Sequence, residues 1–148
     1  MADRLEPIGK AGAEAGEPFD IGGSSRTSRA QQFKEILGKL GQLAGVRGGL
    51  IVTSDGFVIT ADLPPRIPAE ALAALAATLG RELELGMDQP ARGTFRTACF
   101  STDGGAIFLG GSPIGFVILL GDAGAEPAAV SPALLEAVAR LEGAWKMS

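Results

Sequence analysis

Two strand–turn–strand patterns constrain the fold more than any other feature of this sequence. The first consists of the β-rich run Val46–Thr53, the turn Ser54–Gly56 and the run Phe57–Ala61. Asp-Gly between two such runs favours a tight hairpin, because the turn needs a positive φ that glycine adopts without steric cost. A second turn of this kind lies at Asp103–Gly105. Hairpins join antiparallel strands, so the patterns predict an antiparallel sheet.

The second hairpin belongs to a series of three short strands. We expect strands over Thr94–Thr102, Ala106–Leu109 and Ile114–Leu120, with a turn over Gly110–Pro113. Ile114–Leu120 is apolar at nearly every position, which is typical of a strand that is covered on both faces. The sheet is therefore predicted to carry helices on both sides.

A first helix is predicted over Arg29–Ala44. Ser28 and Gln31 have the spacing of a capping box, in which two side chains satisfy the free N–H groups at a helix start. Gly45 follows as the left-handed residue at which such helices stop. Between them runs one apolar stripe at helical spacing, made by Phe33, Ile36, Leu37, Leu40 and Leu43.

A second helix is predicted over Pro68–Leu85, because proline suits the first helical position. Gly80 inside it costs about 1 kcal/mol relative to alanine. Either small residues merely fill exposed positions, or a second backbone approaches this side of the helix closely. The stripe expected to face the core is Leu72, Leu75, Leu79 and Leu83, and the row of small residues about 120° away is Ala73, Ala77 and Gly80, ending in Glu84.

A third helix is predicted to be capped by Ser131 and to begin at Pro132. One apolar face of it would be formed by Leu134, Leu135, Val138, Leu141 and Trp145.

These elements predict one domain with the order αββαβββα. The fold class is α/β, a three-layer α/β/α sandwich around a five-stranded antiparallel sheet. Residues 29–148 form the predicted domain. Residues 1–28 lack any apolar period, so we expect them to be a flexible N-terminal tail.

Composition excludes several classes of function. Histidine is absent from the 148 residues, and Cys99 is the only cysteine. Ser-His and Cys-His nucleophiles, imidazole metal sites and cysteine zinc sites are thereby excluded. Cys99 is expected to be a buried, inert thiol. We therefore predict that the protein is not an enzyme and has no catalytic, metal or cofactor site.

Charge and hydropathy limit the partners. The net charge is −4, which disfavours binding to nucleic acid through phosphate contacts. No apolar run reaches the roughly 18 residues of a membrane span, and the first 20 residues lack the apolar core of a signal peptide. A cytoplasmic protein without membrane contact is predicted.

Three segments together resemble a known family. They are GGLIVTSDGFVITADLP at residues 48–64, EALAALAATLGRELEL at residues 70–85 and GFVILLGD at residues 115–122. Their order and spacing are similar to those of the roadblock (dynein light-chain) domain, including the bacterial MglB-type proteins. The resemblance extends from about Arg29 to Trp145.

The resemblance implies a homodimer or heterodimer that acts as a regulator or scaffold for a small Ras-like GTPase. Family dimers pair their second helices antiparallel and join their third strands into one sheet. This implies a homodimer interface at Ala73, Ala77, Gly80, Glu84, Thr94, Arg96 and Ala98. We expect the GTPase to contact Arg66, Arg81 and Glu84, because pairing of the second helices creates a composite surface that a monomer lacks.

Two other functions remain open at this point. The chain could be a scaffold or motor-adaptor subunit without a GTPase partner. It could also be a small-molecule sensor, although the tight apolar patterning leaves few polar groups to line a pocket.

Overall fold

The computed structural model describes residues 21–88, 90 and 95–146, with the side chains of residues 29–87, 90 and 95–146. These residues form three helices and five strands in the predicted order αββαβββα. The elements are α1 (Ile21–Gly41), β1 (Val46–Thr53), β2 (Val58–Asp62), α2 (Ala69–Asp88), β3 (Thr97–Thr102), β4 (Gly105–Ser112), β5 (Gly115–Gly121) and α3 (Pro127–Lys146).

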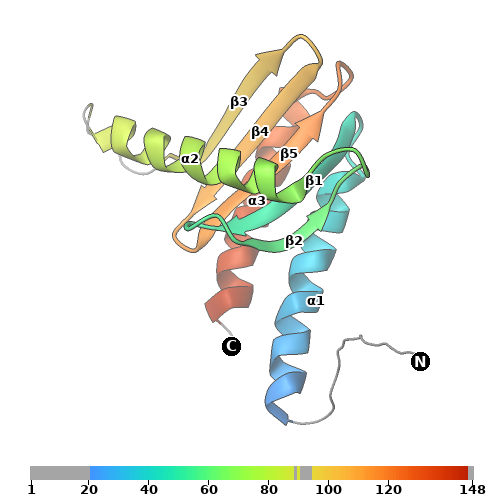
Figure 1. Cartoon of the computed structure of the whole chain (residues 1–148), viewed down its shortest axis with the longest axis vertical. Coiled ribbons are helices and arrows are strands. Elements are labelled where there is room, and N and C mark those ends of the chain that lie inside the picture. Colours follow the sequence, from blue (N-terminus) through green and yellow to red (C-terminus); the bar gives the residue numbers. More distant parts are fainter. Residues whose placement is uncertain (1–20, 89, 91–94, 147–148) are drawn as a thin grey trace.

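The strands form one antiparallel sheet with the order β2-β1-β5-β4-β3. Helices α1 and α3 pack side by side on one face, and α2 lies alone on the other (Figure 1). The three-layer α/β/α prediction is confirmed. Because β5 is central, both of its faces are buried, as its continuous apolar run predicted.

Each face of the sheet has its own hydrophobic core. The core under α1 and α3 contains Phe33, Phe108 and Leu134, and the core under α2 contains Leu50, Phe116 and Ile118. Alternate residues of a strand point to opposite faces, so a single strand such as β5 supplies both cores. The sheet thus separates two hydrophobic cores and contributes side chains to both.

The predicted Asp-Gly turn after β1 is confirmed, whereas Gly45, the predicted stop of the first helix, lies four residues after Gly41, where α1 ends. Gly45 has a φ of 84° directly before β1, and Gly56 has a φ of 96° in the β1–β2 turn. The turn is closed by the Gly56 N–H, which donates to the Thr53 carbonyl at 2.9 Å. Both positions therefore need a residue that adopts the left-handed conformation cheaply.

The predicted start of the first helix is wrong. Helix α1 begins at Ile21 and ends at Gly41, so Ser28 lies inside it and does not cap it. Ser28 and Gln31 have the spacing of a capping box, but the helix already starts seven residues before Ser28. The spacing alone therefore does not mark a helix start. Residues 21–28 of the predicted tail belong to α1, and for residues 1–20, which lie outside the described residues, the flexible tail stays a prediction.

The third helix also begins earlier than predicted. Its first turn forms at Pro127, where the N–H groups of Ala129 and Val130 both donate to the Glu126 carbonyl at 2.9 Å. Ser131 and Pro132 lie one turn inside. Pro127 and Pro132 both suit the first turn of a helix, and the earlier of the two begins α3.

Strand β4 extends to Ser112, so the turn predicted over Gly110–Pro113 lies instead at Pro113 and Ile114. Gly110 and Gly111 are paired strand residues, and a side-chain atom at either would meet a neighbour closely. A Cβ at Gly110 would touch Leu134 of α3, and one at Gly111 would touch the ring of Phe95. Close packing, not a turn, therefore accounts for these glycines.

No helix of the described residues is long and apolar enough to cross a membrane.

Candidate functional site

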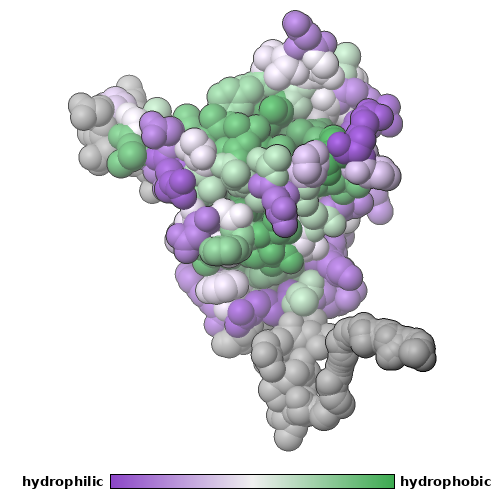
Figure 2. Space-filling model, viewed as in Figure 1, coloured by the Kyte–Doolittle hydropathy of each residue, from purple (hydrophilic) through white to green (hydrophobic). Residues whose placement is uncertain are grey.

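Helix α2 covers only part of its face of the sheet. It packs across β1 and β5, touches β4 less, and leaves β3 largely uncovered (Figure 1). On this face Figure 2 shows apolar surface next to α2, over the strands on its β3 side. We call this region the open face, defined by Leu75 and Leu79 of α2 and by Phe100, Ile107 and Leu120 of the sheet.

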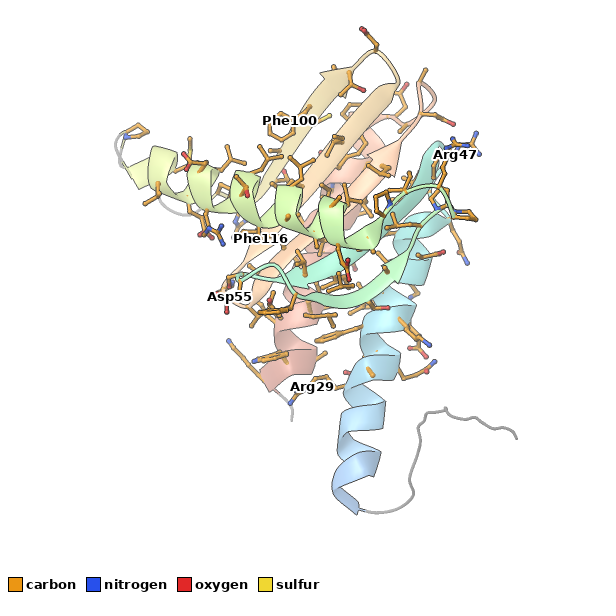
Figure 3. The ribbon with its side chains drawn as sticks, viewed as in Figure 1. Arg29, Arg47, Asp55, Phe100 and Phe116 are labelled. Atoms are coloured by element: carbon orange, nitrogen blue, oxygen red, sulfur yellow. The ribbon has the colours of Figure 1, made fainter. Side chains whose placement is uncertain are left out.

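The row of small residues on α2 packs against the chain's own sheet. Ala73 and Ala77 are 0% and 2% exposed. Gly80 is buried against Phe116 of β5, and a Cβ there would overlap the phenyl ring. Phe116 lies behind α2 in Figure 3. The prediction that Ala73, Ala77 and Gly80 contact a second copy is therefore wrong, because the chain's own fold already buries all three.

The leucine stripe of α2 lies at the side of this contact. Leu75 is 41% exposed, and Leu79 and Leu83 are half-buried against the core beneath α2. Only Leu72 of the four is buried. The prediction that this stripe forms the core side of α2 is wrong for Leu75. A helix lying flat on a sheet buries small residues beneath it and places larger ones along its flanks.

The position of Arg81 shows which side of α2 faces β1 and β2. Its Nη1 donates to the Ser54 carbonyl in the β1–β2 turn at 2.9 Å. At about 100° per residue, Leu75 and Leu79 lie on the other side of α2 from Arg81. They therefore face away from β1 and β2, toward β4 and β3.

Strand β3 is an open edge of the sheet beside these leucines. Its partner on one side is β4, and the other side carries no strand among the described residues. Residues Thr97–Thr102 include neither a charged residue nor proline, the usual protections of an exposed edge. Phe100 pairs with Ile107, which packs on the α2 side, so Phe100 is placed on the open face (Figure 3).

The other predicted residues of β3 have mixed outcomes. Arg96 is exposed directly before the strand, and Ala98 packs against the core beneath α2. Thr94 lies outside the described residues. Cys99 is exposed, so the prediction of a buried thiol is wrong. An edge strand leaves side chains accessible that would be covered in the middle of a sheet.

The three predicted GTPase contacts do not form one site within a single chain. Arg66 precedes α2, whereas Arg81 and Glu84 lie in its carboxyl-terminal half, about 18 Å or more along the helix from Ala69. Arg66 and Arg81 are exposed and Glu84 is half-buried. Only a second α2 running antiparallel would bring the two ends together.

Arg66 lines a hollow at the amino-terminal end of α2. The hollow has a volume of about 630 Å³, and its apolar floor includes Ile67, Ile107 and Leu120. Arg47 and Asp122 form an ion pair at its rim, with 2.6 Å between Nη2 and Oδ2 (Figure 3 labels Arg47). The hollow continues the open face toward the β3–β4 turn, since Thr102 and Gly104 also line it.

Asp122 is held in its ionised form. The Gly124 N–H donates to its Oδ1 at 2.7 Å, and this hydrogen bond and the Arg47 guanidinium lower the pKa of the carboxyl from its usual 3.8. The pair joins β1 to the segment after β5 and needs no ligand to explain it. Among residues 21–88, 90 and 95–146, no group of acidic or cysteine side chains could hold a metal ion.

Comparison with known proteins identifies the fold. The family model described as Roadblock/LC7 domain matches residues 32–109. The gliding protein MglB of Thermus thermophilus is 16% identical, with a TM-score of 0.72 over 82% of this chain and 93% of that one. MglB of Myxococcus xanthus is 12% identical, with a TM-score of 0.73 over 80% and 90%.

A third similar structure is a Roadblock/LC7 domain from Streptomyces avermitilis. It is 16% identical, with a TM-score of 0.69 over 77% of this chain and 97% of that one. No curated protein sequence is significantly similar to the chain. At these identities the structures show a shared fold.

Proposed function

Because this chain belongs to the Roadblock/LC7 domain family, we propose that it forms a homodimer through α2 and β3, and that the dimer binds and regulates a small Ras-like GTPase. The observation that supports the dimer is the open face. Leu75, Leu79 and Phe100 lie beside an unprotected sheet edge, and a single chain covers neither. Apolar surface of this kind marks an interaction site.

A second copy fits both features at once. Antiparallel pairing of β3 with its copy would satisfy the free backbone groups of both edges. The same two-fold axis would lay the second α2 over the open face, with leucines of each helix against the other. The contact residues are therefore the leucine flank and β3, in place of the row of small residues.

The dimer would also create the surface for the GTPase. Antiparallel α2 helices would bring the end of one helix that follows Arg66 alongside the end of the other that carries Arg81 and Glu84. A GTPase would then meet a composite surface that a monomer lacks. We expect the protein to act by binding, as a regulator, because the paired helices would offer an exposed, charged surface to the partner.

The dimer is tested by a matched pair of substitutions. Leu75 on the open face and Leu135 on α3 are 41% and 37% exposed. We expect Leu75→Glu to shift sedimentation at tens of micromolar from dimer to monomer, because it places a carboxylate in an apolar interface. Leu135→Glu should leave the dimer unchanged. A wild-type chain that sediments as a monomer of 15.0 kDa would contradict the proposal.

The regulatory role is tested by nucleotide state. The dimer is titrated with the Ras-like GTPase that co-purifies with it, loaded with GDP or with a non-hydrolysable GTP analogue. We expect a clear preference for one state, because the γ-phosphate orders the switch loops that such a partner contacts. Equal affinity for both states would favour a scaffold, since such a ligand cannot shift the switch.

A further inference from the structure

The second open edge of the sheet, β2, differs from β3 because helices project past it. Helix α1 continues beyond β2 toward its own amino-terminal end, and the carboxyl-terminal part of α3 runs beside it (Figure 1). The two are joined there by Phe33 and Trp145, whose rings stack with centroids 6.3 Å apart, and by Arg29 over Trp145 at 4.5 Å. The helices thus form a shelf beside the outer edge of β2.

A groove runs between this shelf and the strand. It has a volume of about 210 Å³ and is lined by Lys34, Leu37 and Gly38 of α1 and by Thr60, Ala61 and Asp62 of β2. A Cβ at Gly38 would meet nothing within 4 Å. Glycine within a helix costs about 1 kcal/mol relative to alanine, and packing within the described chain does not require it here.

The groove has the chemistry to receive one extended segment. Residues Val58–Ala61 carry neither charge nor proline, and the outer side of β2 has no strand partner among the described residues. Lys34 and Asp62 line the same groove, yet neither forms an ion pair in the described part of the chain. An added strand could therefore form hydrogen bonds with the free backbone groups of β2 and ion pairs with Lys34 and Asp62.

A second copy of the domain does not fit this edge well. Continuing the sheet into another domain would bring the projecting α1 of each copy against the helices of the other. A single segment with no domain attached avoids this collision. The occupant should therefore be a peptide segment.

We propose that the chain's own first residues, around Arg4–Ile8, occupy this groove as an added strand along β2. From Ile21 to Lys34–Gly38 the helix spans about 20–26 Å, which an extended chain of about eight residues covers. Residues up to about 13 can therefore reach the groove, and Phe19 cannot. Leu5 and Ile8 are the large apolar residues within reach.

Charge and tethering both favour this segment. Arg4 and Glu6 flank Leu5 and can complement Asp62 and Lys34. A short tether supplies an effective concentration in the millimolar range, so even weak strand pairing is populated. The covered β2 edge would then be closed to other chains, leaving β3 as the edge for self-association.

The test is the hydrogen exchange of β2 backbone amides in the full-length protein. We expect exchange in β2 to be about tenfold slower in the wild-type chain than in the double variant Leu5→Asp, Ile8→Asp. Phe19→Asp is the matched control in the same segment and should exchange like wild type. Gly38→Leu should speed β2 exchange by filling the groove, whereas Gly143→Leu, equally open on α3, should not.

Each contrary result has a distinct meaning. Fast exchange of β2 in the wild-type chain would overturn the proposal, and so would protection that persists in the Leu5→Asp, Ile8→Asp variant. Protection that grows with protein concentration would assign the groove to another copy's segment and overturn occupancy by the same chain. None of these results depends on the α2 and β3 dimer, which the Leu75→Glu sedimentation test measures separately.

Discussion

Gly80 shows how one residue sets the distance between a helix and a sheet. The ring of Phe116 lies where a Cβ at Gly80 would be, so any side chain there forces α2 away from β5. We expect Gly80→Ala to lower the free energy of unfolding by about 1–3 kcal/mol, the usual cost of overpacking. Urea denaturation of the purified protein measures it.

The control for this change lies in the same helix. A Cβ at Gly86 meets nothing within 4 Å, so Gly86→Ala should be neutral or stabilise by up to about 1 kcal/mol through helix propensity. Equal effects of the two substitutions would show that Gly80 does not carry the close contact.

Asp122 gives the fold a pH dependence. Because its pKa is lowered in the folded state, its contribution to stability is present above the usual pKa of 3.8 and is lost as pH falls through the lower folded value. Asp122→Asn should therefore be less stable than wild type at pH 6, and the difference should shrink by pH 3. Urea midpoints at both values measure it, and a constant difference would rule out titration of this carboxyl as the cause.

At the scale of single elements, the sequence predicted the hairpins better than the sides of α2. The Asp55–Gly56 turn depends on the φ of Gly56, so neighbouring residues suffice to predict it. The burial of Gly80 depends on Phe116, 36 residues later in the chain, and no local period reveals it. From hydropathy, the leucines of α2 were predicted to face the core. In the structure α2 packs on the sheet mostly through small side chains, which allow the helix to approach closely.

Two leucines of α2 test this account of the helix. Leu72 is 8% exposed and Leu75 is 41% exposed. Leu72→Ala should cost about 2–5 kcal/mol by leaving a cavity, whereas Leu75→Ala should change the stability of the folded monomer by less than about 1 kcal/mol. The measurement is urea unfolding at a concentration at which the protein is monomeric. If Leu75→Ala were the costlier change, the leucine stripe would face the core after all.

At the scale of the whole molecule, the helices cover the two faces of the sheet to different extents. Helices α1 and α3 pack together over one face, while α2 leaves the β3 side of the other exposed (Figures 1 and 2). The order of elements could be predicted from the sequence, but the open face could not. It follows from where α2 crosses the sheet, which depends on contacts between distant residues.

The charges around the open face lead to a prediction about binding rate. In the proposed complex Arg66 lies at both ends of the helix pair, where it would attract the GTPase before contact is made. Charges at an interface act mainly on the association rate, and salt screens them over about 10 Å at 0.1 M ionic strength. We therefore expect Arg66→Glu to slow association about tenfold at low salt, and much less at high salt, with little change in dissociation.

Arg140→Glu is the control, because it changes the net charge equally from an exposed position on α3, across the sheet from α2. Stopped-flow association of the dimer with its GTPase, measured across a range of salt concentrations, compares the two variants. A general effect of net charge would slow both variants equally and would place the GTPase elsewhere. An effect confined to Arg66→Glu would locate the encounter at the α2 side of the sheet, where only a dimer presents two copies of Arg66 to one partner.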